Sequence, residues 1–504
     1  MDNTNNFNFS IKDKKKTIII SLILSIIFRY FFLNNYLGIS MPIFIGIIIF
    51  SIHNIFPKFY ANLKNNLDHL IFLIPIIALS LTFAIYNNEY LKFYNIIILI
   101  FLIYSYFLFI KNKSNKLNIE FFVDLGEKFL ESIFLGFIYI FPFLKEISKS
   151  INRPKKELSS TKKQIFIGIL ISIPILFILI SLLASADSIF LYYTKEFFNL
   201  FSNLNININF PTETLFVIVI FFLLIFGFIL SLDIKDQSTG YKIEEKEKLT
   251  QLKKLEFKIP SITSSTILIS INIVYLIFTI VQFSYLYAGN TNLPNNMNFS
   301  EYARRGFFEL VFLTIINQII LSFCMKYSDK SNKKISTLLN YLYSILILLT
   351  FNMLFSAAYK MNLYQNAYGF TRLRIGVFAF IILFALILSI NFVAIWRRNI
   401  PVVKLVLIST LLVYTSFNYV NVDKIIAKNN IEVYKKTNII DINYLKKLSI
   451  DCHLELYKLT KTKNSSINNN ITVHLEAQKK KTEKKYDSWF EFNYYKSKLI
   501  KLNI

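Results

Sequence analysis

The chain has 504 residues, of which 54% are hydrophobic and 17% charged, and its formal net charge is +25. Soluble globular chains carry about 25% charged residues, and here the apolar residues gather in runs of about 20, the length that crosses a bilayer core. The composition therefore excludes a string of ordinary soluble domains. In a soluble protein such a basic charge would indicate nucleic acid, but most lysines stand in short loops between apolar runs, as in cytoplasmic loops. We expect a lipid bilayer as partner and no nucleic acid.

Eleven apolar runs have the length of a membrane-spanning helix. The first follows Lys14-Lys15-Lys16 without a small-residue cleavage site, so we interpret it as a retained anchor. The expected fold class is all-α, a polytopic transmembrane helix bundle of about 11 spans. The predicted spans are 17–33, 36–56, 69–86, 91–110, 164–184, 212–232, 262–286, 306–325, 336–357, 372–396 and 402–420.

The distribution of basic residues between the loops predicts the orientation. With the N-terminus in the cytoplasm, the first three outer loops carry a single lysine, Lys195, while the inner loops are rich in Lys and Arg. An odd number of spans then places the C-terminus outside. The predicted parts are a basic cytoplasmic tail (1–16), four spans (17–110), a cytoplasmic loop (111–163), a transmembrane core (164–420) and a polar, small extracytoplasmic C-terminal domain (421–504).

The segment 121–143 within the cytoplasmic loop does not fit a span. Asp124, Glu127, Lys128 and Glu131 interrupt it, and its clean apolar part is too short to cross comfortably. We predict an amphipathic helix on the inner membrane surface, and a re-entrant helix stays open as the alternative. At the other end of the chain, residues 484–502 are basic and rich in Trp, Tyr and Phe, a composition typical of a segment that folds back on the membrane surface.

A charged motif opens the predicted span that starts near residue 306. Glu301, Arg305 and Glu309 are four residues apart and form an alternating ladder on one helical face, which leaves Arg304 without an obvious partner. One interpretation is an interfacial ladder that orients the helix, with Arg304 reaching the lipid headgroups. The other is an anion-binding pair at an outward-facing cavity. The sequence alone leaves both open.

A second basic cluster lies in the connection before the span at 372–396. Gly369 is suited to a helix stop and Thr371 to the next helix cap. Outer loops are normally poor in basic residues, so two such clusters on one side predict a cationic pocket for phosphate or carboxylate, in an anionic lipid or a small anion. The predicted anion-binding residues are Arg304, Arg305, Arg372, Arg374 and Lys360, supported by Glu301, Glu309, Tyr302, Tyr364, Tyr368 and Asp187.

The sequence carries no recognisable catalytic or metal-binding signature. None of the four histidines forms a ligand pair at helical spacing, and the two cysteines form no framework. Asp451-Cys452-His453 places a thiol beside an imidazole, but sequence neighbours point apart. We expect no cofactor and no metal, and we predict no enzyme class. Polar residues inside the spans are expected to bond across helices, namely Asn272, Gln282, Asn317, Asn352 and Asn391.

Several of these stretches resemble a known family. Ala184-Ser185-Ala186-Asp187, the motif from Ser300 to Leu310, and Ala367 to Arg374 are similar to signatures of the bacterial membrane family called domain of unknown function 4173, which is related to the 4153 group. The resemblance covers roughly residues 160 to 500, and its tail matches lie at 423–430, 441–451 and 487–489. It implies a multi-pass protein of the bacterial inner membrane with no known biochemical role, and it names neither a substrate nor a catalytic residue.

Two classes of function follow from these observations. The first is transport, or the handling of lipid or cell-envelope material, through the outward-facing cationic pocket. The alternative is a non-transporting membrane sensor or scaffold that uses its C-terminal domain as a partner surface. Buried polar groups that extend to mid-membrane favour the first class, and a sealed bundle with an exposed patch on the tail favours the second. The sequence identifies no protein partner.

Overall fold

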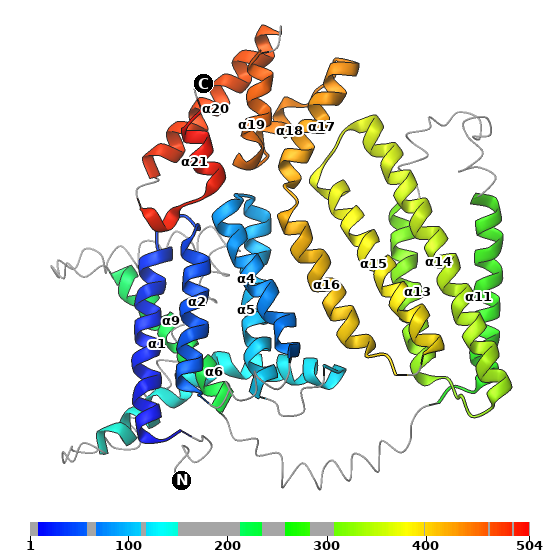
Figure 1. The fold of residues 1–504 in the computed structure, drawn as a ribbon, viewed down its shortest axis with the longest axis horizontal. Coiled ribbons are helices and arrows are strands. Elements are labelled where there is room, and N and C mark those ends of the chain that lie inside the picture. The colour runs from blue at the N-terminus through cyan, green and yellow to red at the C-terminus, as the bar shows by residue number, and fades with distance from the viewer. Residues whose placement is uncertain are drawn as a thin grey trace, which may run out of the picture. The chain divides into compact units, whose positions relative to one another are not determined.

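The computed structural model describes residues 9–57, 67–111, 117–149, 212–233, 258–282, 307–397, 399–461, 464–485 and 488–502. Within these residues the regular structure is helical, with sixteen α-helices, a few short 3₁₀ turns and one bridge between Ile259 and Ser328 (Figure 1). The predicted all-α class is therefore confirmed. The chain divides into two compact units, one of residues 1–69, 103–115 and 120–240 and the other of residues 70–102, 116–119 and 241–504.

The first unit is built around a long pairing of its first and last helices. Ser10 caps helix α1 together with Asp13, whose carboxylate bonds back to the cap. The buried face of α1 includes the small residues Thr17, Ser21 and Ser25, which let it pack closely along α9. The helices of this unit are α1 (Ile11–Phe32), α2 (Ser40–Ile55), the last part of α5 (Glu89–Lys111), α6 (Ile119–Lys149) and α9 (Thr212–Asp233).

Helix α6 covers the segment in which we predicted an amphipathic helix. Its buried residues recur at helical spacing, from Phe121 and Leu125 to Ile140 and Phe143, whereas Asp124 and Glu127 are exposed. It crosses α9 at two glycines, Gly136 and Gly227. A Cβ atom at Gly136 would lie 1.9 Å from the Leu223 carbonyl oxygen, so only a residue without a side chain permits this approach. Placement of α6 on a membrane surface stays a prediction.

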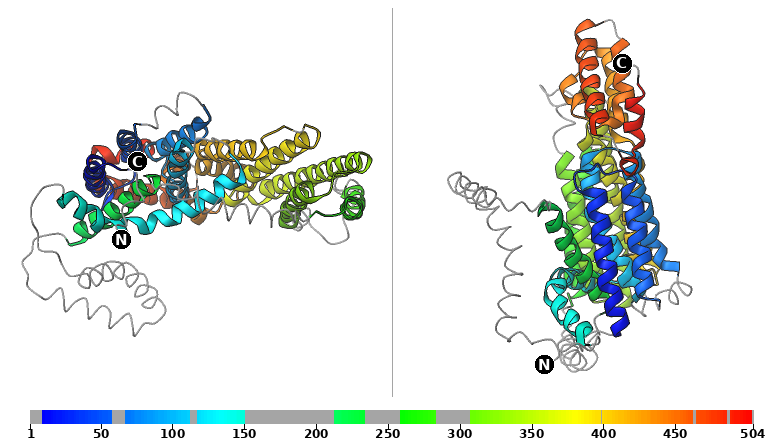
Figure 2. Two further views of the ribbon diagram at one scale, coloured as in Figure 1. Left: turned by 90° about the horizontal axis from the view of Figure 1, so that it is seen from below. Right: turned by 90° about the vertical axis from the view of Figure 1, so that its left-hand side faces the viewer.

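The second unit combines a row of long helices with a C-terminal helical segment, by which we mean residues 422–502. In Figure 1 and in the right-hand view of Figure 2, the orange and red helices of this segment lie at one end of the long helices of the same unit. The long helices are α4 (Leu70–Ile85), the first part of α5, α11 (Ser261–Gln282), α13 (Phe307–Tyr327), α14 (Lys333–Tyr368), α15 (Arg372–Trp396) and α16 (Val402–Tyr419). The segment contains α17 (Val422–Thr437), α18 (Ile442–Lys446), α19 (His453–Leu456), α20 (Ser465–Lys485) and α21 (Tyr494–Ile500).

Eight helices of the described chain are long and apolar enough to cross a membrane. They match eight predicted spans, but the expected number of eleven is not confirmed. The run at 36–56 forms α2, which has 16 residues and is short for a span. The run at 17–33 lies in α1, whose first turns are rich in lysine, and α1 is not among the eight. The predicted span 164–184 lies outside the described residues.

Helix α14 is longer than the span we predicted at 336–357. Its 36 residues make it about 54 Å long at 1.5 Å per residue, so it extends well beyond a hydrocarbon core of about 30 Å. The final turns carry Lys360, Tyr364 and Tyr368, which the sequence assigned to a connection. The helix ends where predicted, at Gly369.

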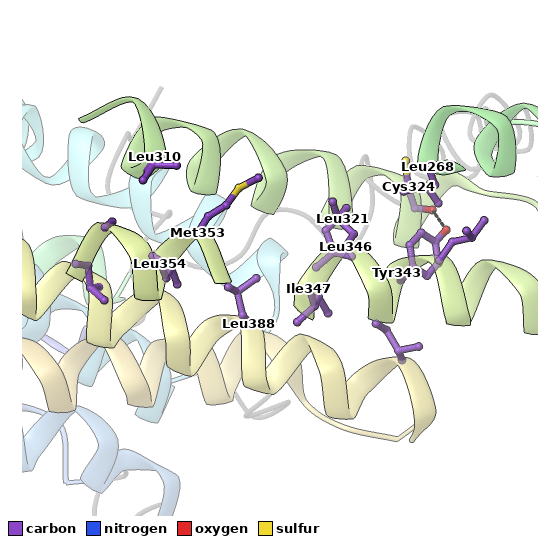
Figure 3. Close-up of a cluster of buried hydrophobic side chains, with 14 of the residues drawn as sticks. Leu268, Leu310, Leu321, Cys324, Tyr343, Leu346, Ile347, Met353, Leu354 and Leu388 are labelled. Carbon is purple, nitrogen blue, oxygen red and sulfur yellow. Dashed lines mark hydrogen bonds between the residues drawn. The ribbon is translucent and has the colours of Figure 1, made fainter. Parts of the chain in front are cut away.

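Four long helices of the second unit share one apolar core with polar cross-links. Figure 3 shows Leu268, Leu321, Leu346 and Leu388, which α11, α13, α14 and α15 contribute at successive positions along this core. Polar side chains bond across the same helices, and the predicted interhelical role of the five polar residues is confirmed. The bonds run from Asn272 Nδ2 to the Leu342 carbonyl (3.0 Å), from Asn317 Nδ2 to Thr350 Oγ1 (3.0 Å), from Asn352 Nδ2 to Thr279 Oγ1 (3.3 Å), from Ser356 Oγ to Gln282 Oε1 (2.8 Å) and from Asn391 Nδ2 to Gln318 Oε1 (3.1 Å).

The C-terminal helical segment has an apolar core of its own. Ile426 of α17, Leu456 of α19 and Ile471 of α20 are fully buried in it. None of its helices is among the eight candidate spans. Because Phe370 of the α14–α15 turn and Phe417 of α16 pack against this core, the segment belongs to the same compact unit and does not form a separate one.

The glycine crossing gives a test of the first unit. We expect Gly136→Ala to separate α6 from α9 and to destabilise the protein by about 1–3 kcal/mol, the usual cost of overpacking. Gly126 lies on the same helix, and a Cβ atom added there would meet no other atom within 4 Å, so Gly126→Ala should be neutral or slightly stabilising. Thermal unfolding in detergent compares the two variants. Equal midpoints would contradict the close crossing.

Candidate functional site

The turn that joins α14 to α15 is held by the C-terminal helical segment. Gly369 has φ +81°, a conformation that side chains disfavour. Asn430 of α17 binds this turn on both sides, since its Oδ1 accepts from the Phe370 amide at 2.6 Å and its Nδ2 donates to the Phe370 carbonyl at 3.0 Å. Thr371 then caps α15. The first turn of α15 is thus fixed against α17.

Arg372, the first residue of α15, forms a bidentate ion pair with Asp423 in the first turn of α17. The Nε–Oδ1 distance is 2.6 Å and the Nη2–Oδ2 distance is 2.7 Å. The Asp423 side chain is 1% exposed and the Arg372 side chain 26%. The guanidinium also lies 4.9 Å from the centre of the Tyr90 ring at the start of α5. This geometry is the strong, oriented form of a charge-assisted hydrogen bond.

Asp423 receives two further hydrogen bonds, one from the C-terminal helical segment and one from the residue that precedes α5. The Ser449 amide donates to Oδ2 at 2.9 Å, and Asn88 Nδ2 donates to the same oxygen at 3.2 Å. A buried carboxylate is stable only when it is paired and fully hydrogen-bonded. Asp423 meets that condition with donors from α15, the start of α5 and the segment.

Asp451 forms a second buried carboxylate contact beside the first. Its two oxygens accept from the Asn87 amide at 2.7 and 2.9 Å, and Ser449 Oγ donates to it at 3.1 Å. Burial raises the pKa of Asp451 to about 6. On the other side of this contact, Lys92 Nζ donates to Asn87 Oδ1 at 2.9 Å. We call Arg372, Asp423, Asp451, Asn87 and Asn88 the junction.

The last helix of the segment makes a third attachment, to α4. Asn493 caps α21 and is fully buried, and its Nδ2 donates to the carbonyls of Phe83 and Tyr86, both at 2.9 Å. Lys496, one turn further on, is also buried. Its burial and the neighbouring Lys92 lower the pKa of Lys496 to about 7. Three helix ends are therefore attached to the segment, at α4, α5 and α15.

The predicted anion-binding residues occupy different environments. Arg372 is paired with Asp423, as described above. Arg374 turns back on the end of α14, where its guanidinium donates to the carbonyls of Tyr368 and Gly369 and lies 4.2 Å from the centre of the Tyr364 ring. The rings of Tyr364 and Tyr368 are themselves 4.9 Å apart. A cation at this position complements the C-terminal end of a helix.

Lys360 and Glu309 lie at the same end of the α13–α14 pair as these arginines. Lys360 is buried near the end of α14, and the exposed Glu309, in the first turn of α13, attracts it. The structure thus brings together the start of α13, the end of α14 and the start of α15. The remaining predicted residues, Arg304, Arg305, Glu301, Tyr302 and Asp187, lie outside the described residues.

The thiol–imidazole neighbours in the C-terminal helical segment are held apart. The Cys452 thiol is buried and donates to the Ser449 carbonyl at 3.1 Å, and burial raises its pKa well above the usual value. A thiol of this kind is a poor nucleophile. His453 faces His474 instead, with ring centres 5.7 Å apart at 85°. In the described part of the chain, no three metal-ligating side chains converge.

The sequence reasoning found the arginines but not their carboxylates. Asp423 lies 51 residues from Arg372, and Asp451 lies 364 residues from Asn87. Both aspartates stood in stretches that resemble the family, which was the one available signal, but that resemblance assigned them no role. No spacing rule connects residues so far apart.

The helices and this site define a class, a polytopic α-helical membrane protein whose C-terminal helical segment is attached to the ends of its long helices. The family described as "Domain of unknown function (DUF4153)" matches residues 73–459, and the chain belongs to it. The sequence resemblance pointed to the 4173 family and to its relation with the 4153 group. The family match places the chain in the 4153 group. No curated protein and no solved structure matches the chain.

The histidine pair makes the stability of the C-terminal helical segment depend on pH. Burial, aided by His474, lowers the pKa of His453 to about 3, against 6.5 in an unfolded chain. Below pH 6.5 the unfolded segment therefore binds a proton at His453 that the folded segment does not bind, and the contribution of His453 to stability falls by about 1.4 kcal/mol per pH unit until pH 3. We expect His453→Leu to flatten this slope in hydrogen-exchange measurements between pH 7.5 and 4.5. The raised pKa of Asp451 contributes a slope of opposite sign below pH 6, so the test compares variants and not the total slope.

A matched control for this slope is Leu456→Ala, one turn further along α19 and also fully buried. It should lower stability by about 2–5 kcal/mol, with the same pH slope as the wild type. A slope unchanged by His453→Leu would show that protonation of this imidazole is not coupled to unfolding.

Proposed function

We propose that this protein is a non-transporting membrane sensor or scaffold, in which the C-terminal helical segment is the receiving surface and the junction transmits its state to the long helices. The observation that carries the proposal is the buried Arg372–Asp423 pair. Its strength depends on geometry that a small shift of α17 would break. The state of the segment and that of the first turn of α15 are therefore linked.

The attachments support transmission to several helices at once. Asp451 holds the chain just before α5, Asn493 holds the end of α4, and α16 leads through Val420 and Asn421 directly into α17. A partner that shifts the segment therefore acts on α4, α5, α15 and α16 together. If the partner binds one position of the segment more tightly than another, it shifts these helices between two states, as a switch requires. Ile439 and Val473 are exposed apolar residues of the segment, at 77% and 65% respectively.

A second candidate is the handling of an anionic lipid or small anion through an outward-facing cationic pocket. Buried Lys360 favours it, because a buried cation near the end of a long apolar helix can attract an anion. Polar cross-links such as Ser356–Gln282 and Asn317–Thr350 continue from that end into α11, α13 and α14. Arg372 and Arg374 contribute less to this candidate, since a carboxylate and two carbonyls already occupy their guanidinium groups.

Hydrogen exchange on the full chain tests the sensing proposal. In Asp423→Asn the carboxylate charge is lost and Arg372 is left without its partner, which costs about 3–5 kcal/mol at a buried pair. We expect faster exchange in the C-terminal helical segment and also at the first turns of α15 and α5. The control is Asp441→Asn, an exposed helix cap in the same segment, where asparagine caps equally well. Faster exchange confined to the segment would contradict transmission.

Anion binding tests the pocket. We expect Arg304→Ala to weaken binding of phosphate, or of vesicles that contain phosphatidylglycerol, relative to the wild type. One lost contact with an ionised group corresponds to about 1.5–3 kcal/mol, a change of roughly tenfold or more in the dissociation constant. Equal binding by both proteins would count against the pocket and would leave the sensing proposal untouched.

A further inference from the structure

The C-terminal stretch from Trp489 to Lys498 presents two different faces. Phe490, Glu491, Asn493 and Lys496 are buried against the rest of the second unit. In the same stretch, the large side chains of Trp489 (65%), Phe492 (42%) and Tyr494 (41%) are exposed. We call these three residues the aromatic face. One side of the stretch thus packs on the protein, while the other side is exposed.

The attachment of Asn493 fixes the depth of the aromatic face relative to the membrane. Phe83 lies in the last turn of α4, a candidate span, and Tyr86 follows that helix directly. Because Asn493 binds the carbonyls of both, the stretch lies at the level where the apolar helix leaves the hydrocarbon. Tyr495 stacks on the ring of Tyr86 at 5.8 Å and holds the same level.

Other exposed aromatic residues lie at this level of the second unit. Tyr90 and Tyr94 open α5, only one and two turns beyond the residues that bind Asp451, and they are 65% and 56% exposed. Trp and Tyr gather where the hydrocarbon meets the headgroups, because an apolar ring and a polar tip suit that boundary. The aromatic face, held at the end of α4, and the two tyrosines at the start of α5 thus both stand where such residues are expected.

The charge beside the aromatic face fits the same surroundings. Lys498 Nζ lies 4.5 Å from the centre of the Tyr494 ring, and Lys501 is exposed. An ammonium group at the end of a flexible chain, next to a ring at the interface, reaches phosphate groups of lipid. Apolar rings with flanking lysines are the composition of segments that lie in the plane of a membrane surface.

We propose that Trp489, Phe492 and Tyr494 insert into the headgroup region of the bilayer and anchor the end of the C-terminal helical segment there, with Lys498 on lipid phosphate. The occupant is the lipid interface and not a protein. This anchor goes beyond the sensing role and does not require it. The segment would then be attached to lipid as well as to α4, α5 and α15. The lipid attachment lies at the C-terminal end of the segment, and α17 lies at its N-terminal end.

The two tryptophans of the chain permit a direct test in the full-length protein. Trp396→Phe leaves Trp489 as the only tryptophan. Reconstituted into vesicles of phosphatidylcholine and phosphatidylglycerol, this variant should emit at shorter wavelength than a tryptophan in water. Nitroxide lipid labelled near the headgroup should quench the emission more strongly than lipid labelled at the acyl end. Lys498→Gln in the same background should weaken quenching in vesicles rich in phosphatidylglycerol more than in phosphatidylcholine alone.

The matched control moves the tryptophan to an exposed site away from the long helices. Ile439 follows the far end of α17, which is 16 residues long and therefore about 24 Å in length, and Figure 1 shows α17 leading away from α16. The variant with Trp396→Phe, Trp489→Phe and Ile439→Trp should be quenched by acrylamide in water and not by either lipid label. Absence of lipid quenching at Trp489 would overturn the anchor, whether acrylamide reaches that ring or not.

Discussion

The arrangement of the second unit depends on one buried carboxylate, Asp423. It holds a guanidinium, a backbone amide and a side-chain amide that come from three separate parts of the chain. Placing a carboxylate in a low-dielectric interior is unfavourable unless every lone pair finds a donor. The position of α17 relative to α15 and α5 is therefore restricted to the arrangement in which all these donors are in place, and the apolar core of the segment then packs within that restriction.

Buried ion pairs give specificity of arrangement more dependably than they give stability. The apolar residues of the C-terminal helical segment, such as Ile426 and Leu456, pack without directional bonds, so they do not by themselves fix a register. The directional bonds of the junction fix it. Asp451 repeats the principle with a backbone amide as donor, and Asn493 repeats it with two carbonyl acceptors. Charged and polar groups thus decide where the segment sits, while apolar burial supplies the driving force for its folding.

Sequence reasoning succeeded where the relevant physics is local or periodic. A run of about 20 apolar residues identifies a span regardless of its neighbours, and eight such runs have matching helices. Gly369 and Thr371 predicted the turn before α15, because a positive φ angle and a helix cap depend only on residues that are close in sequence. The close crossing at Gly136 and Gly227 was not foreseen. It depends on which two helices meet, and no local pattern contains that information.

The charged site shows why the groups that bind the arginines could not be predicted from the sequence. The rule that outer loops avoid basic residues counts charges on one side of a membrane and takes no account of carboxylates contributed from elsewhere in the chain. Arg372 therefore looked like a receptor for an external anion, whereas Asp423, 51 residues away, already supplies one. Arg374 meets the carbonyl ends of α14 in the same way. A basic residue at a helix end indicates an external ligand only if no acceptor within the protein already binds it. For the buried Lys360, the first internal group to consider is Glu309 of α13, whose carboxylate attracts the ammonium group.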